Sequence, residues 1–394
     1  MTTPAANLAV PTRTPSLRLT SLRHWLRLRP ARGAFRIGDG WLTAYLSVLF
    51  GVLSLAGVLA FHFPAHLTIP ELRASYDIPT LRAGLAGLMV LSGVFGVMGL
   101  ARKRLMIAGA GLGLLGLAAL LGGADTPLGP LQASGFYVGL DWFVLGLLST
   151  GVVFTLLEKS APLREEQPVL REDWSLDLKH FFVMHLLLGA YLAGTNFLLV
   201  QGLGWARFEV ITDFLSGLPF IVQFFAIMLA VDLVEYGVHR AYHSRGFLWR
   251  IHAVHHSSKT MDWLASSRLH VLEALITRTA TLAPIFLLGF DQAAVNAYAL
   301  MIGFHATFIH ANIDWDLRWL EPVFVTPRHH HWHHAKDAAA HNKNFAVHFA
   351  FIDRLFGTLH MPAGWPSEYG IGGEEPVQSY RAHTLHPFKG LLQA

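Results

Sequence analysis

Long apolar runs alternate with short polar loops along most of the chain. Each run has about 18 residues or more, the length that an α-helix needs to cross roughly 30 Å of hydrocarbon. The pattern predicts eight spans, near 41–62, 83–101, 105–123, 134–157, 179–203, 217–238, 271–290 and 293–312. The predicted fold class is therefore all-α, a polytopic integral membrane protein with about eight transmembrane helices.

The composition agrees with a membrane protein and excludes several kinds of site. Of the 394 residues, 53% are hydrophobic and only 14% are charged, whereas soluble proteins carry roughly 25% charged residues. The absence of cysteine excludes disulfide frameworks and thiolate metal sites. Histidine is abundant instead, because 16 of the 23 histidines fall between His239 and His360. The chemistry is therefore expected in that stretch.

Basic residues predict the orientation in the membrane. The first 40 residues hold seven arginines and no acid before Asp39, which is typical of a basic arm and not of a signal peptide. Loops at 102–104, 159–171 and 240–268 are also basic and fall on the same side. The positive-inside rule places that side, with both termini, in the cytoplasm. The alanine-, glycine- and arginine-rich composition favours a bacterial inner membrane.

A charged stretch with two prolines, near 160–172, divides the apolar sequence and is interpreted as a linker. Glycines in the second and third spans indicate closely packed helices, and no ionisable residue lies in the middle of either span. The expected organisation is a basic cytoplasmic arm, a transmembrane helix bundle, a histidine-rich half and a C-terminal tail, at 1–40, 41–160, 172–362 and 363–394.

Four histidine motifs fall where predicted helices leave the membrane. In HRAYH the two rings are four residues apart and project about 40° from each other on a helix. The triplets in WRIHAVHH and RHHHWHH keep three rings within roughly a 100° arc. The pair in HATFIH is about 140° apart, so it serves two different ions or lies on a distorted helix. The candidate ligands are His239, His243, His252, His255, His256, His305, His310, His330, His333 and His334.

A single HxxxH motif is a weak signal, because buried histidines often have only a structural role. Four motifs within 96 residues have a common explanation, since neutral imidazole is a good ligand for iron, zinc, copper and nickel. Ten histidines exceed the three or four protein ligands of a zinc site and suit two ions with open positions. There is no HExxH motif and no glutamate inside the histidine motifs, so the pattern of a zinc hydrolase is missing.

Asp232 is a candidate for orienting a ligand ring. It lies seven residues before His239 and thus on the same face of a helix. A carboxylate at that place can bind the second nitrogen of a ligand imidazole. A salt bridge from Asp232 to Arg240 or Arg328 is the plainer alternative.

Other polar residues near the motifs are weaker candidates. His329 and His331 lie about 100° to either side of His330 on a helix, so they are expected to face head groups or water. The remaining candidates for extra ligands or supporting contacts are His270, His341, Asn344 and His348.

The ordered motifs DLVEYGVHRAYH, WRIHAVHH, HATFIHANIDW, TPRHHHWHH and NKNFAVHFAFIDRLFGT resemble the sterol desaturase and fatty acid hydroxylase superfamily. The likeness covers about 172–362, and it implies that this half is the catalytic domain. In that family the histidine boxes hold a non-haem di-iron centre at the cytoplasmic membrane face, so the ten candidate histidines are the implied iron ligands. Two positions depart from the family, which often has glycine at Ala346 and tryptophan at Ile352. Both departures bear on the packing of Asn344 and Asp353.

The resemblance implies an O2-dependent oxidoreductase that hydroxylates or desaturates a C–H bond of a sterol, a fatty acyl chain or another membrane lipid. Such an enzyme needs two electrons per turnover. The chain has no plausible GxGxxG unit and no HPGG-like haem motif, so no fused haem, flavin or nicotinamide site is expected. The expected electron donor is a separate ferredoxin, cytochrome or reductase, and no nucleic-acid partner is expected.

Two other classes of protein can be rich in membrane histidines. A transition-metal transporter or storage protein is the main alternative, but transport sites lie near mid-bilayer on broken helices, whereas these motifs lie at one face. A di-haem cytochrome needs ligands on facing helices and leaves two HxxHH triplets unexplained. The favoured interpretation is a membrane di-iron oxygenase.

Overall fold

The computed structural model describes residues 40–73, 75–131, 137–244, 246–373 and 375–389. Within this part of the chain the regular elements are helices, which confirms the all-α prediction. They are α2 (Trp41–His62), α3 (Pro64–Leu67), α4 (Pro70–Arg73), α5 (Ile78–Ala101), α6 (Leu105–Leu120), η1 (Gly123–Asp125), α7 (Leu140–Ser160), α8 (Trp174–Leu186), α9 (Leu188–Leu203), η2 (Gly204–Ala206), α10 (Glu209–Ser216), α11 (Phe220–Ser244), α12 (Gly246–His256), η3 (Trp263–Ser267), α13 (Val271–Leu288), α14 (Gln292–His310), α15 (Pro327–His333), η4 (Ala338–Ala340), α16 (Ala350–Leu355), α17 (Tyr380–Leu385) and η5 (His386–Phe388). Apart from Gly40, the predicted basic arm lies outside the described residues.

Among the residues that the structure describes, six helices are long and apolar enough to cross a membrane: α2, α5, α6 together with η1, α7, α11 and α13. A seventh span results if α8 and α9, which are bent by 52° at a short break, count as one. The predicted eighth span, α14, does not qualify in the described residues, because Asn296, His305 and His310 make it more polar. The count of eight is therefore not confirmed, although several spans are.

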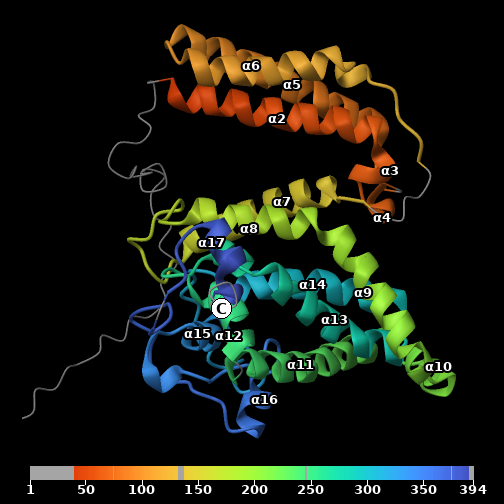
Figure 1. Ribbon diagram of the computed structural model, residues 1–394, viewed down its shortest axis with the longest axis vertical. Helices are drawn as coiled ribbons and strands as arrows, with labels where there is room; N and C mark the ends of the chain where they lie inside the picture. Colours follow the sequence, from red (N-terminus) through yellow and green to blue (C-terminus); the bar gives the residue numbers. More distant parts are fainter. Residues whose placement is uncertain (1–39, 74, 132–136, 245, 374, 390–394) are drawn as a thin grey trace, which may run out of the picture.

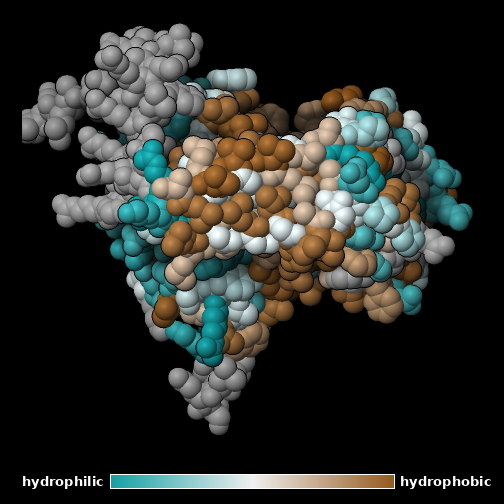
Figure 2. Space-filling model, turned by 90° about the horizontal axis from the view of Figure 1, so that it is seen from above, coloured by the Kyte–Doolittle hydropathy of each residue, from teal (hydrophilic) through white to brown (hydrophobic). Residues whose placement is uncertain are grey.

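The first three long helices pack into a compact layer. In Figure 1, α2, α5 and α6 lie side by side at the top, and α7 and α8 form the next layer. Ser47 and Ser92 donate to each other's carbonyl oxygens between α2 and α5. A Cβ atom at Gly111 would collide with Ser47, so the glycine permits the close approach of α6 that small residues give in lipid. Figure 2 shows a broad hydrophobic area across this face, with hydrophilic residues toward its edges.

The predicted linker near 160–172 packs against the histidine-rich half. The Glu158 carboxylate at the end of α7 accepts from the backbone N–H groups of Trp263 and Asn312, at 2.7 and 3.0 Å. The Arg164 guanidinium donates to the carbonyl oxygens of Pro366 and Ser367 in the C-terminal segment. The stretch therefore ties α7 and the C-terminal segment to the second half of the molecule.

Helices α11, α13 and α14 form the frame that carries the histidines. Helix α12 follows the end of α11, and α15 packs on the end of α14 (Figure 1). A core of apolar residues from α11, α14 and the segment 345–352 holds these elements together. Four histidine-bearing helix ends therefore meet in one region.

Candidate metal centre

Nine of the ten candidate histidines gather into two adjacent groups. Within each group, one nitrogen of every ring lies within 4.8 Å of the corresponding nitrogens of the others. The first group has five members, His239, His243, His252, His256 and His333, and the second has four, His255, His310, His330 and His334. The two histidine triplets, at α12 and α15, each contribute rings to both groups. These two helices therefore join the groups to each other.

In the first group, contacts to oxygen fix which nitrogen faces inward. The Nδ1–H groups of His239, His252 and His333 donate to the Phe345 carbonyl, the Glu273 carboxylate and the Lys343 carbonyl, at 2.8, 2.7 and 2.8 Å. Because carbonyl and carboxylate oxygens only accept, each of these rings carries its hydrogen on Nδ1. The Nε2 atoms of all three rings therefore present lone pairs to the centre.

Two rings of the second group are oriented in the same way. The Nδ1–H of His255 donates to the Arg268 carbonyl at 3.1 Å, and that of His310 donates to the Ala306 carbonyl at 2.7 Å. The Nε2 atoms of these two rings lie 3.3 Å apart, and the His310 and His330 Nε2 atoms lie 3.0 Å apart. The His255 and His310 lone pairs thus face each other across a buried space.

These contacts test whether the residues suit a metal ion. Two facing lone pairs repel each other unless a cation lies between them. Ligand nitrogens about 2.1 Å from an ion and at right angles to each other are about 3.0 Å apart, close to the 3.1 Å between the Nε2 atoms of His239 and His252. The buried Nε2 atoms of His243 and His333 have no hydrogen-bond partner in the described chain. The donor set fits metal ions in both groups.

Burial keeps the rings of α12 and α15 in the form that binds metal. Loss of solvent, and then the neighbouring histidines, hold the pKa values of His252, His256 and His334 well below the usual value of 6.5. The same causes act on the pKa of His330 and of His333. Neutral imidazole, the form with a free lone pair, is therefore present at physiological pH.

His305 does not join either group, contrary to the expected set of ten ligands. Its Nε2–H donates to the Val325 carbonyl at 3.2 Å, and its ring packs against that of His348. The offset of about 140° on α14 turns His305 away from the side that His310 faces. The pair is therefore divided, with His310 in the second group and His305 in neither group.

Asp232 has a different role from the one expected. Its carboxylate accepts three backbone N–H groups, from Val347, His348 and Phe349, at 2.8, 3.0 and 2.6 Å. It forms no salt bridge with Arg240 or Arg328, because Arg328 pairs with Glu321 and the Arg240 guanidinium donates to the Tyr236 hydroxyl. Asp232 therefore holds the segment whose Phe345 carbonyl orients His239.

Asn344 also supports backbone, since it adopts a positive φ of 57°. Its side-chain amide donates to the carbonyls of His329 and His360, and its oxygen accepts from the His360 N–H. Asp353 accepts from the N–H groups of Phe345 and Ala346. The alanine at position 346 and the isoleucine at 352 are both fully buried. The departures from the family at these two positions are therefore compatible with the contacts of Asn344 and Asp353.

The three other candidate histidines lie outside both groups. His270 caps α13 by accepting from the Leu272 N–H, and its Nε2 donates to the Thr384 carbonyl. His348 bonds the Tyr298 hydroxyl, while His341 is exposed. Each of them is used elsewhere or faces outward.

His329 and His331 are buried, and the expectation that they face head groups or water is wrong. The Nδ1 of His331 bonds the Tyr369 hydroxyl at 2.8 Å, and its Nε2–H donates to the His310 carbonyl. His329 lies 3.4 Å from the Asp353 carboxylate. Helix α15 is covered on every side, because the segments that follow it fold back around it.

Glu273 is a supporting residue that the spacing of the histidine motifs does not predict. Its carboxylate bonds the His252 ring, although 21 positions separate the two residues. An acidic residue at the start of a membrane span is unusual, and this was the available signal. Glu273 lies outside the histidine motifs, so those motifs alone do not point to it.

A buried ion network holds the carbonyl that orients His255. The fully buried Arg268 pairs with Asp177, which also pairs with Arg171. Arg171 in turn bonds both oxygens of Asp262 at 2.8 Å. The Arg268 guanidinium also donates to the Gln378 amide oxygen. The linker, α8, η3 and the C-terminal segment therefore meet behind one candidate ligand.

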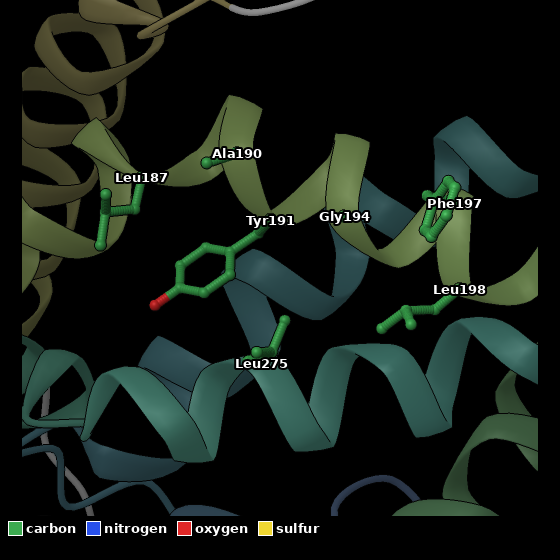
Figure 3. Close-up of a pocket in the computed structure, with 7 residues that line it drawn as sticks. All are labelled: Leu187, Ala190, Tyr191, Gly194, Phe197, Leu198 and Leu275. Atoms are coloured by element: carbon green, nitrogen blue, oxygen red, sulfur yellow. The ribbon is translucent and has the colours of Figure 1, made fainter.

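An apolar groove runs between α9 and α13 (Figure 3). Its volume is about 490 Å³, and it is lined by Leu187, Ala190, Tyr191, Gly194, Phe197, Leu198 and Leu275. The Tyr191 hydroxyl, the polar end of this lining, donates to the Val271 carbonyl at 3.2 Å.

Comparison with known proteins gives one family. Residues 224–358 match the family described as fatty acid hydroxylase. The chain is 32% identical over 168 residues to the ornithine lipid hydroxylase OlsE of Rhizobium tropici, covering 42% of this chain and 50% of that protein. Alkylglycerol monooxygenases of Danio rerio and Homo sapiens are 32% and 31% identical over 134 and 136 residues, which are 33% and 34% of this chain and 29% and 30% of theirs. No solved structure matches this chain.

The matches confirm the resemblance inferred from the histidine motifs. The segment that matches the family contains both histidine groups and Glu273. The chain spans half or less of the length of these three relatives.

Proposed function

We propose that this chain, which carries a fatty acid hydroxylase domain at residues 224–358, is a membrane-bound di-iron oxygenase that hydroxylates a C–H bond of a membrane lipid. The names of the relatives support a lipid substrate, since they include an ornithine lipid hydroxylase and alkylglycerol monooxygenases. The observation that carries the proposal is the pair of buried histidine groups whose lone pairs converge.

One iron ion is assigned to each group. The first would be held by His239, His243, His252, His256 and His333, and the second by His255, His310, His330 and His334. Bound iron would supply the activation of O2 and the oxidation of an unactivated C–H bond, with two electrons from outside the chain. Histidine-only sites that leave coordination positions open suit this chemistry better than zinc hydrolysis.

The protein's own groups hold the rings and exclude water. Glu273, Arg268 and the segment 343–345 accept the Nδ1–H groups of four rings and thereby fix the direction of their inward nitrogens. Such supporting contacts typically change metal affinity by 10–100-fold. Tyr242 stacks on the His252 ring, and Trp249 covers His243 and His256.

We assign the centre to the cytoplasmic face of a bacterial inner membrane. The basic loops that precede and follow the histidine motifs support this orientation. A centre at helix ends is reachable by a separate ferredoxin, cytochrome or reductase and also by lipid from the bilayer. The helices of 41–160 would then serve as a scaffold for the catalytic half at 172–362.

The test compares lipid extracts of cells that express the wild-type chain with cells that express His255→Ala or His333→Ala. We expect a lipid heavier by one oxygen atom in the wild-type extract and its absence from both variants. Identical extracts from all three strains, with all chains present in the membrane, would refute the proposal. Transport of zinc or nickel into liposomes by iron-free protein would favour the transporter instead.

A further inference from the structure

Two opposite charges lie within membrane-spanning helices. Glu235 is on α11, one helical turn before His239, and Arg278 is on α13, five residues after Glu273. The two charges interact electrostatically, but neither side chain forms a hydrogen bond or an ion pair with any described residue. Charged side chains at such places are costly, and they are usually paired or functional. Because no described residue donates or accepts a hydrogen bond at either side chain, both are open to contact with a charged ligand.

The helix geometry places Arg278 between the groove and α11. At 100° per residue, Arg278 projects about 40° from Ala274 and about 60° from Leu275. Ala274 is buried, and Leu275 lines the groove. On the neighbouring helix, the Tyr242 hydroxyl bonds Thr277 at 3.0 Å, so α11 packs on the same stretch of α13. Arg278 is exposed, and it also interacts electrostatically with Tyr191 of the groove.

The groove suits an acyl chain. Its lining is apolar apart from the Tyr191 hydroxyl, which is already bonded to the Val271 carbonyl (Figure 3). The groove is formed by α13, a candidate span, and by the bent pair α8 and α9, so lipid chains would surround it in a bilayer. Two residues beyond Val271, Glu273 bonds His252. The groove therefore reaches the level of the candidate metal centre within one turn of α13.

We propose that the groove and the Glu235–Arg278 pair bind a lipid whose head group carries both an ammonium and an anionic group. The acyl chain lies in the groove, the anionic group at Arg278 and the ammonium at Glu235. This rests on the proposed function and adds the substrate class. A lipid with one charge or none leaves at least one of the two side chains without a hydrogen-bonding group of opposite charge in a medium of low dielectric constant.

Binding to the metal-free full-length chain in detergent tests the proposal without catalysis. The probes are an ornithine lipid, a phosphatidylglycerol and a diacylglycerol with the same acyl chains, and bound lipid is counted by native mass spectrometry. We expect the ornithine lipid to bind at least about tenfold more tightly, the effect of one charged hydrogen bond. Arg278→Gln and Glu235→Gln should each remove this preference, and Arg278→Lys should retain most of it.

Two glycines of α9 provide a matched test of the groove. A Cβ atom added at Gly194 or at Gly202 meets no other atom within 4 Å, so both positions tolerate a larger side chain. Only Gly194 lines the groove. Gly194→Leu should therefore weaken the binding of the ornithine lipid, whereas Gly202→Leu should not.

Equal binding of the three lipids, or an unchanged preference in both charge variants, would overturn this inference. Its failure is distinguishable from that of the proposed function. Selective binding without any oxygenated lipid in cells would refute the function and leave the binding site standing. An oxygenated product together with unselective binding would refute the binding site alone.

Discussion

Most of the proposed ligand rings are oriented by a group that holds their second nitrogen. Five of the nine rings donate Nδ1–H to an oxygen, and for His252 that oxygen belongs to the Glu273 carboxylate. A carboxylate gives a charge-assisted bond, which is stronger than a bond to a neutral carbonyl. Glu273 is therefore the supporting group whose loss is most informative.

Glu273→Gln removes the charge and keeps the size of the side chain. We expect the iron affinity of the purified protein to fall about 10–100-fold, because the amide no longer fixes the His252 ring as strongly. Competition with an iron chelator measures this change. Glu368→Gln is the control, since Glu368 pairs with Lys336 in an exposed position. Equal iron retention by both variants would contradict the role of Glu273.

The two histidines of α14 should behave differently. His305→Ala should leave the iron content unchanged, because His305 faces Val325 and His348 instead of the groups. His310→Ala should lower the iron content, because it removes one ring of the four-membered group. Metal analysis of the two purified variants checks both outcomes. Loss of iron in the His305 variant would show that the set of nine is incomplete.

Single residues also show which parts of the site can be predicted from the sequence. Helical spacing identifies all nine gathered histidines, since i, i+3 and i+4 positions share a face. It cannot identify Glu273, whose contact with His252 depends on how α13 packs on α12. It also fails for His331, because helix geometry gives the direction of a ring but not what covers that side.

At the scale of elements, a few polar contacts fix the segments that orient the candidate ligands. The segment 345–349 adopts no regular secondary structure, and the Asp232 carboxylate accepts hydrogen bonds from three of its N–H groups. The same segment supplies the Phe345 carbonyl for His239. The position of this segment therefore determines how the His239 ring is oriented in the candidate metal centre.

Asp232→Asn leaves one oxygen to accept these N–H groups and removes the charge. We expect the free energy of unfolding to fall by about 2 kcal/mol or more, the contribution of one bond to a charged group. Thermal unfolding in detergent measures the loss. Asp316→Asn, which alters an exposed pair with Arg318, should unfold like the wild type. An unchanged melting temperature in Asp232→Asn would mean that the segment is held by packing alone.

Element boundaries were predictable where an apolar run stands alone. The ends of α2, α6 and α13 lie close to the predicted spans, because hydrophobic length is a local property. The prediction of one straight span at 179–203 was less successful, since α8 and α9 bend between two helices. The stretch near 160–172 was predicted only as a linker, because a polar sequence does not reveal which of its side chains are buried. Arg171 in fact lies buried between Asp177 and Asp262.

At the scale of the whole molecule, buried neutral histidines make stability depend on pH. Burial lowers the pKa of His348 and of His383 to about 3, from the usual 6.5. Between these values the unfolded chain binds protons that the folded chain does not. The stabilising effect is therefore complete above pH 6.5 and decreases as the pH falls toward 3.

At pH 5 each of these two histidines should lower the free energy of unfolding by about 2 kcal/mol relative to pH 7. The melting temperature of the metal-free protein should fall accordingly, and His383→Gln should weaken this pH dependence. Melting curves at pH 7, 6 and 5 provide the measurement. A melting temperature that is constant over this range would contradict the buried neutral state.

The most direct test of the central claim is the metal content of the purified full-length chain from iron-replete cells, measured by elemental mass spectrometry. Two groups of converging histidine nitrogens predict about two iron ions per chain. A preparation that holds no bound metal, or a single ion, would contradict a two-ion centre built from these nine histidines.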